Sequence, residues 1–220
     1  VLAALKTALS QSTVTSSDFF DHLRSIGGDQ REEVERVITE YELPAAAAMV
    51  NVYEYYYVKG HTDRILPPAE IARRINELQR DGVAICAGAF ERLYTDNLST
   101  IKGGSFEIEL AYELNKDGEN VEAVSKKIEG SDMDILVSGS IVYEAKNIEL
   151  SEYSEFLLKE VIDSIDRKID SYIDETDYDL IVSFRSEKVS QAASELIEEL
   201  EDEYQIEINT RADKGYVEHE

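Results

Sequence analysis

The segment SDMDILVSGSIVYEAKN, residues 131–147, decides how the rest of the chain is interpreted. It contains two apolar runs joined at a Gly-Ser pair, and a two-residue turn of this composition predicts a β-hairpin. Alternate residues of a strand share one face, so Glu144 and Lys146 point to the same side of the second strand, while Asp134 lies on the first. Two carboxylates and a lysine on neighbouring strands are the groups that a magnesium-dependent phosphodiester hydrolase needs.

The composition offers a competing explanation for any single acid. The chain has 47 acidic and 22 basic residues, which gives a net charge of -25. Such a surplus in a well-patterned chain is typical of adaptation to multimolar salt, because the screening length falls to about 3 Å at 1 M. We therefore expect a halophilic source, in which most surface acids serve solubility. Only an acid on a buried face becomes a candidate for chemistry.

Length and composition indicate a soluble protein of one or two domains. Of the 220 residues, 43% are hydrophobic, enough for a proper core. No apolar run reaches the roughly 20 residues that span a bilayer, so we expect no membrane contact. The single cysteine, Cys86, excludes an internal disulfide and argues against a Cys-rich zinc or iron–sulfur site. A reduced, cytoplasmic location is expected.

The pattern changes near residue 100, which predicts two domains, 1–100 and 101–220. The first is expected to be helical and to serve substrate recognition or oligomerisation, with a homodimer as one arrangement. Its apolar spacing, its capping residues and its proline and glycine positions predict the helix boundaries. The predicted helices are residues 16–25, 29–42, 44–59, 68–81 and 84–96.

The second domain is expected to be α/β with a mixed central sheet. Its elements alternate in the order α-β-β-β-α-β-α-β, which is typical of a layered α/β architecture. The predicted helices are 105–116, 151–174 and 187–203, and the predicted strands are 121–128, 132–137, 141–148, 178–184 and 204–208.

The helix that precedes the hairpin adds one acid to the candidate site. Glu107 falls on the same helical stripe as Leu110 and Leu114, so it is predicted to face inward. Glu109 and Glu113 fall on the other side and are expected to lie in solvent. An acid within an apolar stripe must be paired or must hold a metal, because burying an ionised group alone is costly.

These residues resemble the motif of the PD-(D/E)xK nuclease superfamily. The sequence FEIEL over residues 106–110, Asp134 before Ile-Leu-Val, and the Glu144-Ala-Lys146 triplet carry the resemblance, which covers residues 102–210. It is closest to archaeal Holliday-junction resolvases and other restriction-endonuclease-like folds. The resemblance implies an αβββαβ core, with Mg²⁺ or Mn²⁺ held by Asp134 and Glu144. Glu107 would join through water or a second ion, and Lys146 would complete the catalytic set.

The expected function is therefore that of a metal-dependent endonuclease acting on DNA, branched or site-specific. A structural ion pair between Glu144 and Lys146 is the alternative reading of those two residues. At the level of the protein, a catalytically silent binding or assembly protein with a nuclease-like fold is the alternative. A nuclease toxin domain from a longer polypeptide is another, because the sequence starts with Val1.

Nucleic-acid contacts are only weakly indicated. The most basic helix of the first domain carries Arg73, Arg74 and Arg80, which are weak candidates for binding phosphates. Ordinary exposed arginines are the alternative interpretation of this helix.

Overall fold

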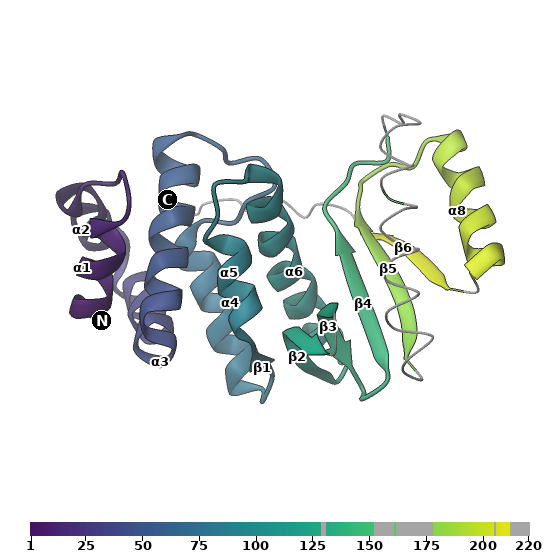
Figure 1. The fold of residues 1–220 in the computed structure, drawn as a ribbon, viewed down its shortest axis with the longest axis horizontal. Coiled ribbons are helices and arrows are strands. Elements are labelled where there is room, and N and C mark those ends of the chain that lie inside the picture. Colours follow the sequence, from purple (N-terminus) through teal and green to yellow (C-terminus); the bar gives the residue numbers. More distant parts are fainter. Residues whose placement is uncertain (129–130, 152–160, 162–177, 205, 212–220) are drawn as a thin grey trace.

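The computed structural model describes residues 1–128, 131–151, 161, 178–204 and 206–211. Over these residues the chain is a mixed α/β protein, in which a block of helices packs against one face of a six-stranded sheet (Figure 1). The helices are α1 Leu2–Ser10, α2 Ser16–Ser25, α3 Gly28–Tyr53, the π-helical turn η1 Glu54–Val58, α4 Pro68–Arg80, α5 Ala87–Leu93, α6 Leu98–Lys116 and α8 Gln191–Tyr204. The strands are β1 Ala84–Ile85, β2 Val121–Ile128, β3 Ser131–Val137, β4 Ile141–Lys146, β5 Asp179–Arg185 and β6 Glu207–Arg211.

Proline and glycine positions explain several boundaries of the helical block. Thr15 caps α2, since its side chain accepts a bond from the backbone nitrogen of Asp18. Within α3 the backbone of Glu42 leaves helical geometry, with φ 53° and ψ -125°, just before Pro44. Proline cannot continue a regular helix, so α3 bends where the predicted helices 29–42 and 44–59 meet. Pro68 opens α4, as predicted.

Two predicted boundaries are wrong. The predicted helix 84–96 is shorter, because Ala84 and Ile85 instead pair in parallel with β2 as strand β1. An apolar run this short has no periodicity that separates helix from strand. In addition, α6 starts at Leu98 rather than 105, because the side chain of Asn97 caps it. The predicted division near residue 100 therefore falls inside a continuous helix.

The sheet has the strand order β1-β2-β3-β4-β5-β6. Strands β2, β3 and β4 are antiparallel neighbours, and the remaining pairs are parallel. The predicted hairpin is confirmed, with Ile135 paired to Tyr143 and Val137 to Ile141, but its loop spans residues 138–140 rather than the predicted two-residue Gly-Ser turn. Because β3 and β4 both have neighbours on two sides, the strands that carry the candidate acids are internal, as expected.

Hydrophobic cores cover both faces of the sheet. The larger core runs without a break from Leu5 of α1 through the helical block to Val124 and Ile181 of the sheet. The smaller core includes Val142 and Leu200 and lies between the opposite face and α8, which Figure 1 shows on the far side of the sheet from α6. The helical block and the sheet thus share one interior over the described residues.

The remaining boundaries differ by a few residues or cannot be compared. Helix α8 begins later than the predicted 187, and β6 begins later than the predicted strand 204–208 and overlaps only its last two residues. The predicted helix 151–174 falls outside the described residues, apart from its residues 151 and 161. Among the helices of the described ranges, none combines the length and apolar character that crossing a membrane requires.

Candidate active site

The four residues predicted from the sequence lie on three adjoining elements. Glu107 is on α6, Asp134 on β3, and Glu144 and Lys146 on β4. The three acidic residues are only 1%, 3% and 2% exposed. Acids with so little contact with water need compensating charge, which separates them from the acidic surface that explains most of the composition.

An arginine brings two of these carboxylates together. The Nη1 atom of Arg92, in the last turn of α5, lies 2.7 Å from Oδ1 of Asp134 and 3.0 Å from Oε2 of Glu107. The two carboxylate oxygens can therefore be no further apart than the sum of these distances. No local pattern singles out Arg92, because an arginine near a helix C-terminus is an ordinary surface residue.

Asp134 is held by the backbone of the neighbouring strand. The backbone nitrogen of Ala145 donates a 2.9 Å hydrogen bond to Oδ2 of Asp134. This bond lies next to the β3–β4 pairing that includes Ile135 and Tyr143. One oxygen of Asp134 thus fixes the carboxylate to β4, and the other faces Arg92.

Glu107 is held from the side of β2. The hydroxyl of Ser125 donates a hydrogen bond to Oε1 of Glu107. Ser125 has a positive φ of 54°, and a Cβ on Gly88 of α5 would come within 3.1 Å of the Ser125 Cβ. The close approach of α5 to this irregular part of β2 therefore needs a glycine. This close approach places Ser125 beside the carboxylate of Glu107.

The Oε2 atom of Glu107 is buried and has no hydrogen-bond partner among the described residues, although Arg92 lies 3.0 Å away. The distance alone does not make a bond, because the N–H direction matters as well. A buried carboxylate oxygen without a donor is an energetic cost that a native fold seldom carries without a reason. It is also the kind of ligand that a hard divalent cation accepts.

Glu144 and Lys146 complete the cluster from β4. The Nζ of Lys146 lies 3.8 Å from Oε2 of Glu144, at the long end of the range for an ion pair. Their shared strand face, as predicted, puts the two charges on the same side. This contact also fits the structural ion pair that was the alternative interpretation.

The acids interact electrostatically as one group. Burial raises the pKa of Glu107 well above its usual range, and the charges of Asp134 and Glu144 raise it further, against the opposing effects of Arg92 and Ser125. Burial lowers the pKa of Arg92, but the carboxylates of Asp134 and Glu107 outweigh this and raise it overall. Glu107 therefore resists ionisation beside Asp134 and Glu144, even with Arg92 nearby.

The residues suit a divalent cation without forming a finished cage. Within the described ranges, no three Asp, Glu, His or Cys side chains are grouped closely enough to hold an ion. Two of the three predicted ligands nevertheless converge on a single cationic nitrogen, and one of their oxygens lacks a donor. An all-oxygen set of this kind fits Mg²⁺ or Mn²⁺, which also keep several water ligands.

The expectation that Glu109 and Glu113 lie in solvent is wrong for Glu109. Its side chain is buried and lies 3.1 Å from Nη2 of Arg185 on β5, and 3.8 Å from Nη1 of Arg74. Helix α6 is covered on more than one side, by the sheet and by α4, so a residue outside the apolar stripe is also enclosed. The expectation does not hold for Glu113 either, since its side chain is only 13% exposed and lies 3.8 Å from Arg211.

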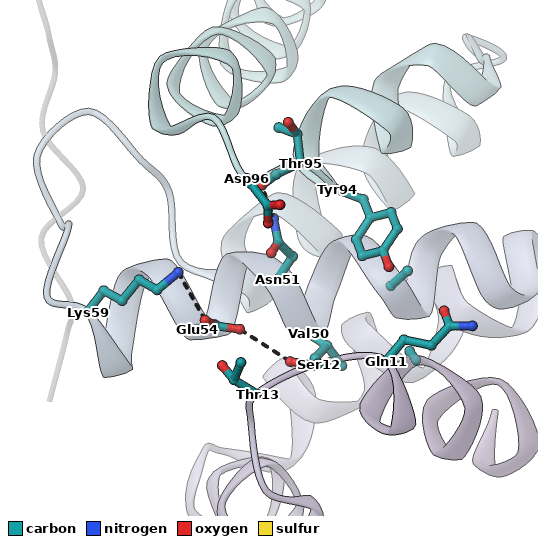
Figure 2. A pocket seen from close by; sticks show the side chains of 12 residues that line it. Gln11, Ser12, Thr13, Val50, Asn51, Glu54, Lys59, Tyr94, Thr95 and Asp96 are labelled. Carbon is teal, nitrogen blue, oxygen red and sulfur yellow. Dashed lines mark hydrogen bonds and ion pairs between the residues drawn. The ribbon is translucent and has the colours of Figure 1, made fainter.

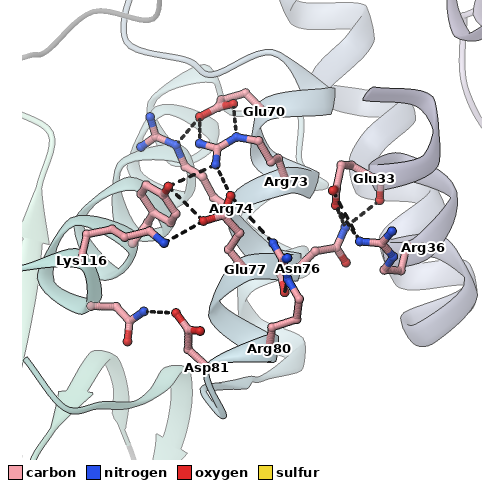
Figure 3. Close-up of polar contacts among 12 residues, drawn as sticks. Glu33, Arg36, Glu70, Arg73, Arg74, Asn76, Glu77, Arg80, Asp81 and Lys116 are labelled. Atoms are coloured by element: carbon pink, nitrogen blue, oxygen red, sulfur yellow. Dashed lines mark hydrogen bonds and ion pairs between the residues drawn. The ribbon is translucent and has the colours of Figure 1, made fainter. Parts of the chain in front are cut away.

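The arginines of α4 are engaged in ion pairs, which Figure 3 shows together. Glu70 accepts bonds from Arg73 at 2.6 and 2.8 Å and from Arg74 at 2.7 Å. Glu77 contacts Arg73 as well and lies 3.9 Å from Arg80, whose side chain is 62% exposed. Binding a phosphate through Arg73 or Arg74 would require breaking these pairs.

A polar pocket of about 440 Å³ lies elsewhere, among α1, the end of α3 and the segment after α5 (Figure 2). Its floor carries Glu54, which lies 3.0 Å from Lys59 and accepts a 3.2 Å bond from Ser12. None of the four predicted site residues lines this pocket. Glu54 and Lys59 pair with each other there, so the carboxylate cluster remains the stronger candidate.

Comparisons of the chain with protein-family models, with curated proteins and with solved structures find no match. The interpretation of the site therefore depends on its own geometry and on the motif resemblance.

Proposed function

We propose that this protein is a metal-dependent endonuclease that hydrolyses phosphodiester bonds in DNA, with Glu107, Asp134, Glu144 and Lys146 as its site. The observation that carries the proposal is the convergence of Glu107 and Asp134 on one cation position, beside Glu144 and Lys146. Acids that served solubility alone would lie in water rather than around a shared point in the interior.

The order of elements supports the same proposal. Helix α6 is followed by the antiparallel strands β2, β3 and β4, and then by β5 parallel to β4. This arrangement agrees with a restriction-endonuclease-like core, in which the acids of the motif lie on the first helix and on two adjacent strands. The motif residues occupy the corresponding elements here.

Each side chain has a distinct part in the proposed site. Asp134 and Glu144 would hold a Mg²⁺ or Mn²⁺ ion, with Glu107 bound directly, through water or to a second ion. When bound, such an ion lowers the pKa of a water molecule and stabilises charge on the phosphate. Lys146, partly exposed beside Glu144, is placed to orient the attacking water or to neutralise negative charge on the phosphoryl oxygens.

One observation favours a second candidate, a nuclease-like protein that binds or assembles without cleaving. Arg92 lies between the carboxylates at the position a cation would take. A permanent arginine there would neutralise the acids and leave no need for an ion. The acids would then be structural, and the helical block would supply the interactions.

A cleavage assay tests the proposal. Plasmid and branched DNA are incubated with Mg²⁺ or Mn²⁺ in concentrated KCl, and the wild-type protein is compared with Glu144→Ala and Lys146→Ala. We expect cleavage by the wild type and a loss of at least 100-fold in each variant, the order of effect of removing one group that stabilises transition-state charge.

Matched controls come from the strand next to the site. Glu122 and Lys127 of β2 are exposed residues of the same chemical types, so Glu122→Ala and Lys127→Ala should cleave like the wild type. Circular dichroism shows whether each variant is folded. Absence of cleavage by the wild type on every substrate, with no metal bound in calorimetry, would reject the enzyme and favour the silent alternative.

A further inference from the structure

Arg92 has features that neither the motif nor the proposed chemistry explains. Its backbone lies at the C-terminal end of α5, where a helix favours a positive charge. Its Cβ would be 3.0 Å from a Cβ on Gly104 of α6, so the two helices are in close contact at this point. The stem of the side chain is thus fixed, and the guanidinium group is directed at the carboxylates.

The guanidinium group uses one nitrogen for both acids. Nη1 lies within ion-pair distance of Asp134 and of Glu107, and the charge of Glu144 also acts on Arg92. The side chain is 27% exposed, so it retains access to solvent from the buried cluster. A group placed in this way can leave toward water without passing through the core.

The guanidinium group of Arg92 and a divalent metal ion cannot occupy the same position between the carboxylates. Mg²⁺ binds carboxylate oxygens at about 2.0–2.1 Å, much closer than the distances that Nη1 keeps from them. A divalent ion also brings two positive charges where the guanidinium brings one. In their ionised forms the three buried acids carry three negative charges, against the two positive charges of Arg92 and Lys146. Exchange of the guanidinium group for a divalent ion improves the charge balance for these ionised forms.

We propose that Arg92 is an exchangeable internal counter-ion, which occupies the cation position in the metal-free protein and is displaced when the divalent ion binds. This inference rests on the proposed function, since it assigns a regulatory part to Arg92 in the same site. It makes the arginine a competitor of the metal. It also accounts for the folding of a protein with three carboxylates gathered in its interior before any metal is present.

Metal binding without DNA tests the exchange directly. Isothermal titration calorimetry with Mn²⁺ in constant KCl compares the wild type with Arg92→Met, which keeps most of the length of the side chain and removes its charge. We expect Mn²⁺ to bind the variant at least tenfold more tightly. Arg24→Met is the matched control, because Arg24 is an exposed arginine of α2 whose ion pair is with Asp21, and its Mn²⁺ affinity should equal that of the wild type.

Stability provides a second readout. In EDTA, Arg92→Met should melt at a lower temperature than the wild type, and Mn²⁺ should remove the difference. If Arg92→Met does not fold, Arg92→Gln keeps hydrogen-bonding capacity and is expected to show the same tenfold tightening. Equal or weaker Mn²⁺ binding in the folded variant would overturn the exchange.

The outcome is separable from that of the cleavage assay. Tighter Mn²⁺ binding by Arg92→Met with no cleavage by the wild type would support the exchange and reject the nuclease. Cleavage by the wild type with unchanged Mn²⁺ affinity in Arg92→Met would support the nuclease and reject the exchange.

Discussion

Replacing Asp134 tests whether each of its two carboxylate oxygens makes a separate stabilising interaction. One oxygen accepts the 2.9 Å bond from the backbone of Ala145, and the other faces Arg92 at 2.7 Å. Asp134→Ala removes both interactions in a side chain that is only 4% exposed. Asp134→Asn retains one acceptor oxygen and can therefore keep one of them.

The expected cost follows from these contacts. A buried backbone N–H left without an acceptor costs about 1–3 kcal/mol. Removing one partner of a buried ion pair costs about 3–5 kcal/mol. The cost of losing the ion pair is smaller here, because Arg92 still pairs with Glu107. In addition, removing the charge of Asp134 relieves its repulsion of Glu107. We expect Asp134→Ala to lower the free energy of unfolding by about 2–4 kcal/mol. The loss for Asp134→Asn should be roughly 1–3 kcal/mol smaller.

Urea unfolding followed by circular dichroism, in EDTA at pH 7 and fixed KCl, measures both free energies of unfolding. For a chain of this size a difference of 1 kcal/mol corresponds to roughly 2–4 °C in melting temperature. Equal costs for the alanine and asparagine variants would refute the assignment of the two oxygens. A negligible cost for both would show that Asp134 is not held by these contacts at all.

Three further predictions concern other parts of the chain. Glu42→Gly should stabilise the protein by about 1 kcal/mol in urea unfolding, because glycine tolerates a φ of 53° and ψ of -125°, whereas Glu42→Ala should not. Burial acts to raise the pKa of Glu70, but bonds from Arg73 and Arg74 outweigh it and lower the pKa below its usual 4.5. This stabilisation is present above that value and is lost as pH falls through the lowered pKa, so the deficit of Glu70→Gln at pH 7 should shrink in unfolding series run below pH 4.5. Raising KCl from 0.1 to 1 M should increase the melting temperature, since the screening length falls from about 10 to 3 Å in a protein of net charge -25; a decrease would contradict the halophilic interpretation.

Local signals predicted most of the elements. The Gly-Ser pair between two apolar runs was enough to predict the hairpin, and Pro68 with the spacing of Ile71 and Ile75 was enough to predict α4. These features depend on neighbouring residues, which a single sequence contains. The short strand Ala84–Ile85 was missed because it depends on pairing with β2, which lies far along the chain.

The direction of a candidate side chain was predicted correctly where a single element determines it. The stripe of α6 predicted that Glu107 faces inward, and strand alternation predicted a common side for Glu144 and Lys146. The prediction failed for Glu109, which is buried by the arginines of two other elements. Arg92 and Ser125 were missed for the same reason, since their roles depend on tertiary contacts with α6 and β3.

The most direct test of the central claim is Mn²⁺ binding by the wild-type protein and by Asp134→Asn and Glu144→Gln, measured by calorimetry alongside DNA cleavage in the same buffer. We expect the wild type to bind Mn²⁺ and to cleave DNA, and each variant to lose both while remaining folded. Wild-type protein that neither binds the metal nor cleaves, or variants that do both as well as the wild type, would contradict the account.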